Sequence, residues 1–403
     1  MKTGTVLVIA LGLTAVGACK KKHAEDGAST SGSAMVKPAE GSAGMAMGSG
    51  SAAEPEKTAP KTGPELAAMY LECTNHLNQG AFDDFKKTCL ADGYVVHEAG
   101  RPDVTTGDKM VAEMADHRAA FPDMKFAPQL VLVNGRNLFG IGLVTGTHTA
   151  AMKGPMGEVP ATNKQTGLLL FHRLTVNDAN KVAEEWSYMD PATMLGQLGL
   201  LPKEAGRQRP PLEKGLDGAP VIVIAADDAK ERANVATVKQ ANAAFNAHKV
   251  ADALAVFSDD AMESDQAGRK DHHGKQAIEQ SWGMLWKAFS DFKIEAKDLF
   301  AAGDYVVTLG TYSGTNDGDL GQKLKQTGKP VTGEFAEVYK LRDGKIAELW
   351  RFRNGMEMAV QMGLMAAPGA PGAGSAAAPA KGDAPAKGDA PAKGDAPAMK
   401  HGG

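Results

Sequence analysis

The chain carries the same order of hydrophobic patterns twice. Apolar residues recur at three- and four-residue spacing in three segments of the first half and three of the second, at 65–78, 81–90, 107–120 and about 231–248, 250–257, 274–289. Apolar and polar residues then alternate in segments such as 129–133, 138–149, 168–176, 182–188, 305–312, 334–341 and 346–352. The first spacing predicts helices, and alternation predicts strands. Helices followed by an antiparallel sheet predict an α+β fold.

Short motifs repeat at matched spacing and indicate a duplication. Trp186 follows Gly146-Thr147-His148 by 38 residues, and Trp350 follows Gly310-Thr311-Tyr312 by the same 38. Phe121-Pro122-Asp123 likewise matches Phe289-Ser290-Asp291. We therefore predict one domain at 65–202 and a second copy at 232–365. In the linker, 203–231, the apolar run Val221–Ile224 predicts an extra strand packed on one domain.

The sequences of the two ends of the chain predict a cellular location and no folded domain. Residues 1–18 have the charge and length of a signal peptide, and Val16-Gly17-Ala18-Cys19 resembles a bacterial lipobox, in which Cys19 is lipidated. Lys20 after the cysteine favours the outer membrane, on its periplasmic or surface face. Residues 19–64 and the repetitive tail 366–403 lack large aliphatic residues, so we expect both to be disordered. The chain is then a lipid-anchored protein of the cell envelope.

Composition narrows the function classes. The formal net charge is −4 and no basic block occurs, which argues against a nucleic-acid binder. Cys73 and Cys89 lie about equally far from the turn of a predicted helical hairpin, so they form either a disulfide or two separate buried thiols. No metal site is expected, because no Cys-x-x-Cys motif or His cluster accompanies them. No cofactor is expected either.

The ordered set of motifs resembles a known family. Each copy has a helical hairpin, a third helix, Phe-x-Asp, Gly-Thr and Glu-x-Trp, and a Gln-x-Gly segment closes it; the second also has the Asp343-Gly344-Lys345-Ile346 hairpin. This set resembles the SnoaL-like branch of the NTF2-like superfamily. The resemblance implies two tandem cones, in each of which a curved sheet wraps around helices and an apolar pocket. The fold hosts ester cyclases, isomerases and binding modules alike, so it does not fix the function.

The acid–base pair of the family's cyclases has no match in either copy. The position expected for its Asp falls on Ser187 in the first copy, and that expected for its His falls near Leu170. In the second copy they fall on Arg351 and Glu337. His97, His148 and His172 remain candidate bases in the first copy, each with the alternative of a hydrogen-bonded core histidine. Asp190, a further catalytic candidate, also fits a helix N-cap before Pro191.

Polar and aromatic residues on the predicted strands are candidates for contact with a ligand, although alternation alone does not show which strand face lines the pocket. These candidates are Trp186, Ser187, Tyr188, Tyr312, Glu337, Tyr339, Trp350 and Arg351. Three hypotheses follow from the pattern. The chain binds a small apolar or amphipathic molecule, it catalyses proton transfer in the first copy, or its two copies form a structural pseudo-dimer; a homodimer is a further form of such pairing.

Overall fold

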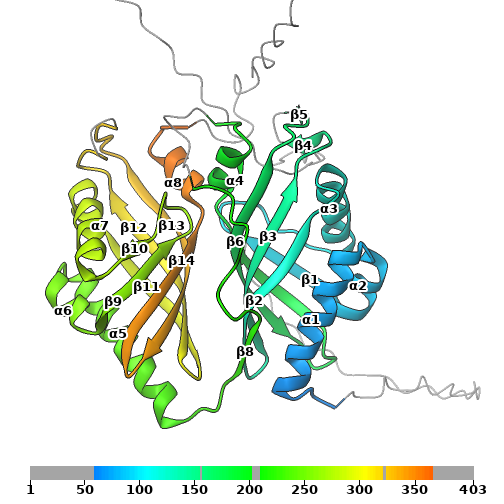
Figure 1. The fold of residues 1–403 in the computed structure, drawn as a ribbon, viewed down its shortest axis with the longest axis horizontal. Coiled ribbons are helices and arrows are strands. Elements are labelled where there is room, and N and C mark those ends of the chain that lie inside the picture. The colour runs from blue at the N-terminus through cyan, green and yellow to red at the C-terminus, as the bar shows by residue number, and fades with distance from the viewer. Residues whose placement is uncertain (1–58, 155–156, 202–208, 321–323, 366–403) are drawn as a thin grey trace, which may run out of the picture.

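The computed structural model describes residues 59–154, 157–201, 209–320 and 324–365 (Figure 1). The predicted signal peptide, Cys19, most of the tether and the tail at 366–403 lie outside the described residues. Among the helices that are described, none has the length and apolar character needed to cross a membrane.

The first domain has four helices and a six-stranded sheet with a small hairpin beside it. Its sheet order is β1-β7-β6-β3-β2-β8, and β4 pairs with β5. The elements are α1 (Gly63–Gln79), α2 (Phe82–Cys89), β1 (Leu90–Glu98), α3 (Gly107–Ala120), β2 (Lys125–Asn134), β3 (Asn137–Thr147), β4 (Met152–Gly154), β5 (Gly157–Val159), β6 (Gln165–Val176), β7 (Val182–Tyr188), α4 (Pro191–Gln197) and β8 (Val221–Ile224).

The second domain repeats this plan, with the sheet order β10-β9-β14-β13-β12-β11. Its elements are α5 (Ala229–Asn246), α6 (Val250–Ala255), β9 (Phe257–Asp265), β10 (His272–His273), α7 (Lys275–Ala288), β11 (Lys293–Ala302), β12 (Tyr305–Thr315), β13 (Pro330–Arg342), β14 (Lys345–Arg353) and α8 (Gly355–Gln361). The α+β fold is confirmed. The sheets are mixed rather than wholly antiparallel, because β1 runs parallel to β7 and β9 parallel to β14.

Local sequence explains where several elements begin and end. Thr62 and Glu65 form a capping box at the start of α1, and Gly80 ends that helix with a φ of 70°. The turn Asp343-Gly344, with φ values of 53° and 74°, joins β13 to β14. The apolar run Val221–Ile224 forms β8, which pairs in parallel with β2 as an extra strand of the first sheet.

The structure corrects one equivalence between the two copies. Asp123 binds the backbone N–H and hydroxyl of Thr147, and Asp291 makes the same two bonds to Thr315. The counterpart of Gly146-Thr147-His148 is therefore Gly314-Thr315-Asn316, not Gly310-Thr311-Tyr312. The matched 38-residue spacing misled because the loop after β12 is shorter than the loop after β3.

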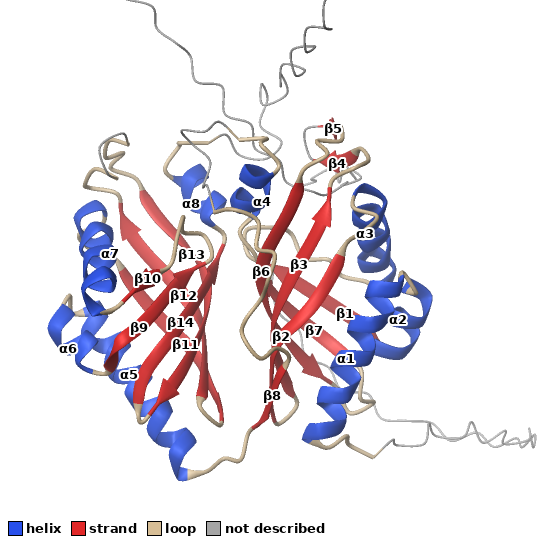
Figure 2. Ribbon diagram, viewed as in Figure 1, coloured by secondary structure: helices blue, strands red, loops and turns tan. Residues whose placement is uncertain are grey.

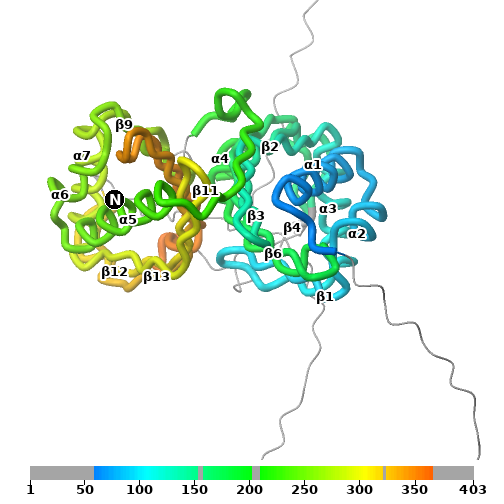
Figure 3. Tube along the Cα trace, turned by 90° about the horizontal axis from the view of Figure 1, so that it is seen from below, coloured from blue at the N-terminus to red at the C-terminus, as the bar shows by residue number. Residues whose placement is uncertain are grey.

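The two sheets pack against each other at the centre of the molecule. Figure 2 shows the strands in the middle, flanked by helices on the two outer sides, and Figure 3 shows α1–α3 and α6–α7 at opposite ends. One apolar cluster joins the sheets, with Phe139 and Phe171 from the first domain against Phe300 and Phe352 from the second. Because one face of each sheet is buried against the other domain, only the opposite face is left to line a cone.

Candidate functional site

Alternation along β13 and β14 separates the two faces of the second sheet. Tyr339 and Leu349 belong to the core that the helices of this domain cover. Trp350 and Phe352 belong to the cluster between the sheets. Side chains in phase with Tyr339 and Leu349, such as Glu337 and Arg351, therefore point into the cone.

The second domain contains a cavity of about 610 Å³ with mostly apolar walls. This volume lies within the range of small-molecule sites. The walls come from α7, α8 and the strands, and the first domain adds Ala192 of α4 and Leu201. Five methionines line it, namely Met284, Met356, Met358, Met362 and Met365. Methionine side chains adapt to irregular guests, so this wall suits ligands of variable shape.

Two side chains mark where this cavity meets solvent. Met284 is 62% exposed and Leu324 is 41% exposed, and both line the cavity. Across the described residues, large hydrophobic side chains with such exposure occur at only two other positions, Ile222 and Ile224 of β8. Half of these exposed apolar side chains thus lie at one cavity, where a guest would cover them.

A charged cluster forms one end of the cavity. The Arg351 guanidinium donates to Glu337 at 2.6 Å and to Glu263 at 3.0 Å. Arg353 donates to Asp265 at 2.7 and 3.2 Å. Burial lowers the pKa of Arg351, but Glu337 and Glu263 outweigh that effect and hold the pKa above its usual value. Both guanidiniums therefore stay charged beside their carboxylates.

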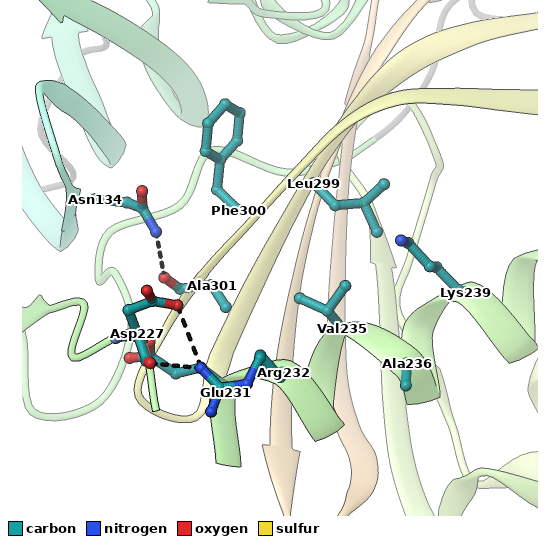
Figure 4. A pocket seen from close by; sticks show the side chains of 10 residues that line it. All are labelled: Asn134, Asp227, Glu231, Arg232, Val235, Ala236, Lys239, Leu299, Phe300 and Ala301. Atoms are coloured by element: carbon teal, nitrogen blue, oxygen red, sulfur yellow. Dashed lines mark hydrogen bonds and ion pairs between the residues drawn. The ribbon is translucent and has the colours of Figure 1, made fainter. Parts of the chain in front are cut away.

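A second pocket, of about 410 Å³, lies beside α5 where the domains meet (Figure 4). Several of its polar groups bond within the protein. Glu231 accepts backbone N–H groups from Ala226, Asp227 and Gly303. Asn134 of the first domain donates to the carbonyl of Ala301 in the second. These bonds make the region a structural junction between the domains.

A chain of hydrogen-bonded polar side chains lies on the inner face of the first domain. The hydroxyl of Tyr70 lies 2.6 Å from Nε2 of His172, and Nδ1 of His172 lies 3.4 Å from Glu185. Tyr94 donates to the other oxygen of Glu185 at 2.6 Å. Burial raises the pKa of both tyrosines, with Glu185 adding to the effect, so they remain phenols. Gly140 permits this packing, because a Cβ there would lie 2.4 Å from both Tyr70 and His172.

A family model and solved structures match these domains. The model of the SnoaL-like polyketide cyclase family matches residues 65–198 and again 236–362, which together exceed half of the chain. The chain belongs to the SnoaL-like polyketide cyclase family. No curated relative matches it.

Three solved structures illustrate the likeness of one SnoaL-like domain. AclR of Streptomyces galilaeus is 22% identical, covers 34% of this chain and 98% of its own, and has a TM-score of 0.31. A SnoaL-like protein of Jannaschia sp. CCS1 is 16% identical, covers 34% of this chain and 94% of its own, and has a TM-score of 0.32. IdmH of Streptomyces antibioticus is 21% identical, covers 32% of this chain and 98% of its own, and has a TM-score of 0.29.

Strand register corrects the expected position of the cyclase-type pair. In the second SnoaL-like domain Arg351 lies opposite Glu337, and in the first Ser187 lies opposite His172. The counterpart of Glu337 is therefore His172, and not Leu170. The structure places Ser187 and His172 of the first domain and Arg351, Glu337 and Tyr339 of the second on the inner faces. Tyr312 lines the cavity of the second domain.

Three aromatic candidates lie outside the cones. Tyr188 and Trp350 belong to the cluster between the sheets, and Trp186 packs against it. The prediction that they line a pocket is wrong. The strand face that carries them is apolar because it packs against the other domain. The alternation alone did not distinguish this buried face from the pocket face.

The remaining catalytic candidates have structural surroundings. His97 stacks on Trp186 at 4.2 Å and lies between Asp103 and Glu184. His148 is fully buried, stacks on Phe121 and accepts the N–H of Thr162. Burial lowers the pKa of His148, which favours the neutral ring.

Asp190 caps α4 by accepting from Thr193, and its other oxygen accepts the N–H of Gly355 at the start of α8. This bond joins the two domains. Both oxygens of the carboxylate are thus engaged by backbone or hydroxyl donors.

Cys73 and Cys89 form a disulfide between α1 and the end of α2, with their Cα atoms 5.9 Å apart. Several inward-facing groups were not among the predicted site residues, among them Glu98, Glu185, Glu263 and Arg353. Glu185 was recognisable as sharing a strand face with Ser187. Glu263 gave no such signal, because β9 was not predicted as a strand.

Proposed function

We propose that the second SnoaL-like domain binds a small apolar or amphipathic molecule in its cavity. The observation that carries this proposal is the 610 Å³ apolar cavity with Met284 and Leu324 exposed at its edge. A guest that covers these side chains removes apolar surface from water, which is the usual source of affinity in such sites.

The first domain supports this site. In its own cone Tyr70, His172, Glu185 and Tyr94 bond to one another, whereas its α4 supplies part of the cavity wall of the second domain. These differences fit a division of roles, in which one copy stabilises the assembly and the other holds the ligand.

Filling the cavity tests the proposal. Ala359 of α8 lines the cavity, and its neighbour Val360 does not. We expect Ala359→Phe to weaken binding of the neutral dye N-phenyl-1-naphthylamine by about tenfold, because the ring occupies the guest's space. Val360→Phe is the matched control and should leave binding nearly unchanged. Equal binding by the unmodified chain and Ala359→Phe, with both folded, would contradict the proposal.

Proton transfer in the first domain is a second candidate. The order Tyr70–His172–Glu185 places an imidazole between a hydroxyl and a carboxylate, the arrangement that prepares a general base. Its test is deuterium uptake at the carbon beside the carbonyl of an added ketone in heavy water. His172→Gln should abolish catalysed uptake, and uptake that persists in this variant excludes the role.

We also propose that the chain is anchored in the bacterial envelope through Cys19. The support is the lipobox-like segment Val16–Cys19 after an uncharged run. Membrane fractionation tests it: Cys19→Ala should move the chain from the membrane fraction to the soluble one. Membrane association that survives this change overturns the anchor.

A further inference from the structure

Arg209 lies in the segment between the domains, and its backbone is fixed to the first of them. Its carbonyl accepts from Nε2 of Gln197 at the end of α4, at 3.3 Å. Three residues on, the N–H of Leu212 bonds to the carbonyl of Gly167 in β6. Both residues between Arg209 and Leu212 are prolines, which restrict the backbone there. The segment that carries Arg209 is therefore held against α4 and β6.

The side chain of Arg209 crosses to the second domain. Its Nε donates to the carbonyl of Gly268 at 3.2 Å, and its Nη2 donates to the carbonyl of Asp265 at 3.1 Å. Nη2 also donates to the carboxylate of Asp271 at 2.9 Å, and that carboxylate accepts the hydroxyl of Ser264 at 2.6 Å. Because the Arg209 side chain is only 5% exposed, these bonds take the place of water around a buried charge. Arg209 thus holds the end of β9 and the loop after it.

This contact reaches the cavity of the second domain at Asp265. Asp265 lines the cavity, and so do Ala192 and Leu201 of the first domain. The cavity wall at this end is therefore made of parts of both domains. Arg209 binds one of its residues in the second domain from a segment that is fixed to the first, so the position of this part of the wall depends on how the two domains are joined.

We propose that Arg209 is a positioning residue for the ligand site, and that ligand binding in the second domain is coupled to its contact with the first. The inference rests on the proposed function of this cavity. A guest that binds the complete cavity stabilises the contact between the domains, because a ligand stabilises the state that it binds. By the same linkage, a change that loosens the contact weakens the binding of the guest.

Dye titration of the full chain tests the role of Arg209. Arg209→Ala should raise the dissociation constant of N-phenyl-1-naphthylamine about fivefold per folded chain. Arg209→Lys keeps a positive charge near Asp271 without the guanidinium fork, so it should recover part of this loss. Arg173→Ala is the matched control, because Arg173 also pairs across the domains, with Asp298, but does not line the cavity. Unchanged affinity in Arg209→Ala, or an equal loss in Arg173→Ala, overturns the assignment.

Hydrogen–deuterium exchange of the full chain measures the coupling itself. The N–H groups of Leu212 and Leu216 bond to acceptors on β6 and β2 of the first domain, and neither residue lines the cavity. Saturating dye should slow exchange of these two amides about threefold, because it stabilises the contact that keeps them closed. In Arg209→Ala the dye should still slow exchange in α8 but not at these amides. Slowing that is confined to the second domain of the unmodified chain contradicts the coupling.

These outcomes separate the inference from the proposed function. If the dye fails to bind the unmodified, folded chain, the cavity is not a ligand site and both proposals fail. If the dye binds the unmodified chain and Arg209→Ala equally well, only the inference about Arg209 fails. Exchange in the unmodified chain decides the coupling by itself, so the inference stays testable even if Arg209→Ala does not fold.

Discussion

Single residues show how the two domains differ in side chains while sharing one fold. Ser187 lies opposite His172 in the first sheet, and Arg351 lies opposite Glu337 in the second, so His172 corresponds to Glu337 and Ser187 to Arg351. The first cone closes its polar groups into a chain of side chains, whereas the second leaves arginines at a cavity wall. His148 and its counterpart Asn316 differ in another way. Both are buried at the same loop, but only the histidine carries a titratable ring.

The buried neutral His148 predicts a pH dependence of stability. Burial lowers its pKa in the folded chain, so the unfolded chain binds more protons below the ordinary value of 6.5. Stability is therefore fully present above that pH and is lost as the pH falls. His148→Asn introduces the residue that the second domain has at this position, Asn316. It should reduce the fall in the free energy of unfolding between pH 7.5 and pH 5 by roughly 1 kcal/mol, as measured by urea unfolding. Identical losses in both chains would mean that His148 does not contribute.

At the scale of elements, the short helices α4 and α8 connect the cavity to both domains. Asp190 caps α4 and accepts from Gly355, and Asn354 caps α8 and donates to the carbonyl of Ala99. Thr193 completes the pattern by donating to the carbonyl of Gln266. The counterpart caps thus act as reciprocal bonds between domains, and both helices contribute side chains to the cavity wall.

Removing the Asp190 cap should affect stability and binding together. Asp190→Ala loses the N-cap and leaves the buried N–H of Gly355 without its acceptor, so unfolding should become easier by about 2 kcal/mol. Dye binding should weaken as well, because α4 and α8 line the cavity. Thermal unfolding and dye titration measure the two effects.

Asp190→Asn is the intermediate case. Asparagine caps helices as well as aspartate does, but its single acceptor oxygen can keep either the bonds from Thr193 or the bond from Gly355, not both. It should therefore lose about half as much stability as Asp190→Ala. A normal melting temperature for Asp190→Ala would show that the bonds of this carboxylate carry little.

The sequence predicted the fold better than the site, for reasons that particular residues show. Alternation and motifs revealed the duplicated α+β domains and the added strand at Val221–Ile224. They did not reveal which face lines a cone, because both faces of each sheet are buried and Trp350 looks like a pocket residue. β9 was missed since Asp259, Asp260 and Glu263 obscure its pattern. The buried Glu263 accepts from Arg351 and from Trp282, both distant in sequence.

The molecule as a whole consists of two sheets packed against each other, with a chain of bonded polar side chains in the first cone and an apolar cavity in the second. Arg173 of the first domain lies over the ring of Phe300 and pairs with Asp298 of the second, which extends the apolar contact between the sheets at its edge. We therefore expect the chain to be one binding unit with a single ligand site rather than two equivalent sites.

Native mass spectrometry of the gently purified full chain tests that claim most directly. At the concentration of N-phenyl-1-naphthylamine that half-saturates the unmodified chain, we expect at most one added dye mass per chain and about tenfold lower occupancy in the folded Ala359→Phe variant. Two bound dye molecules per chain, or equal occupancy in Ala359→Phe, would contradict a single site in the second domain.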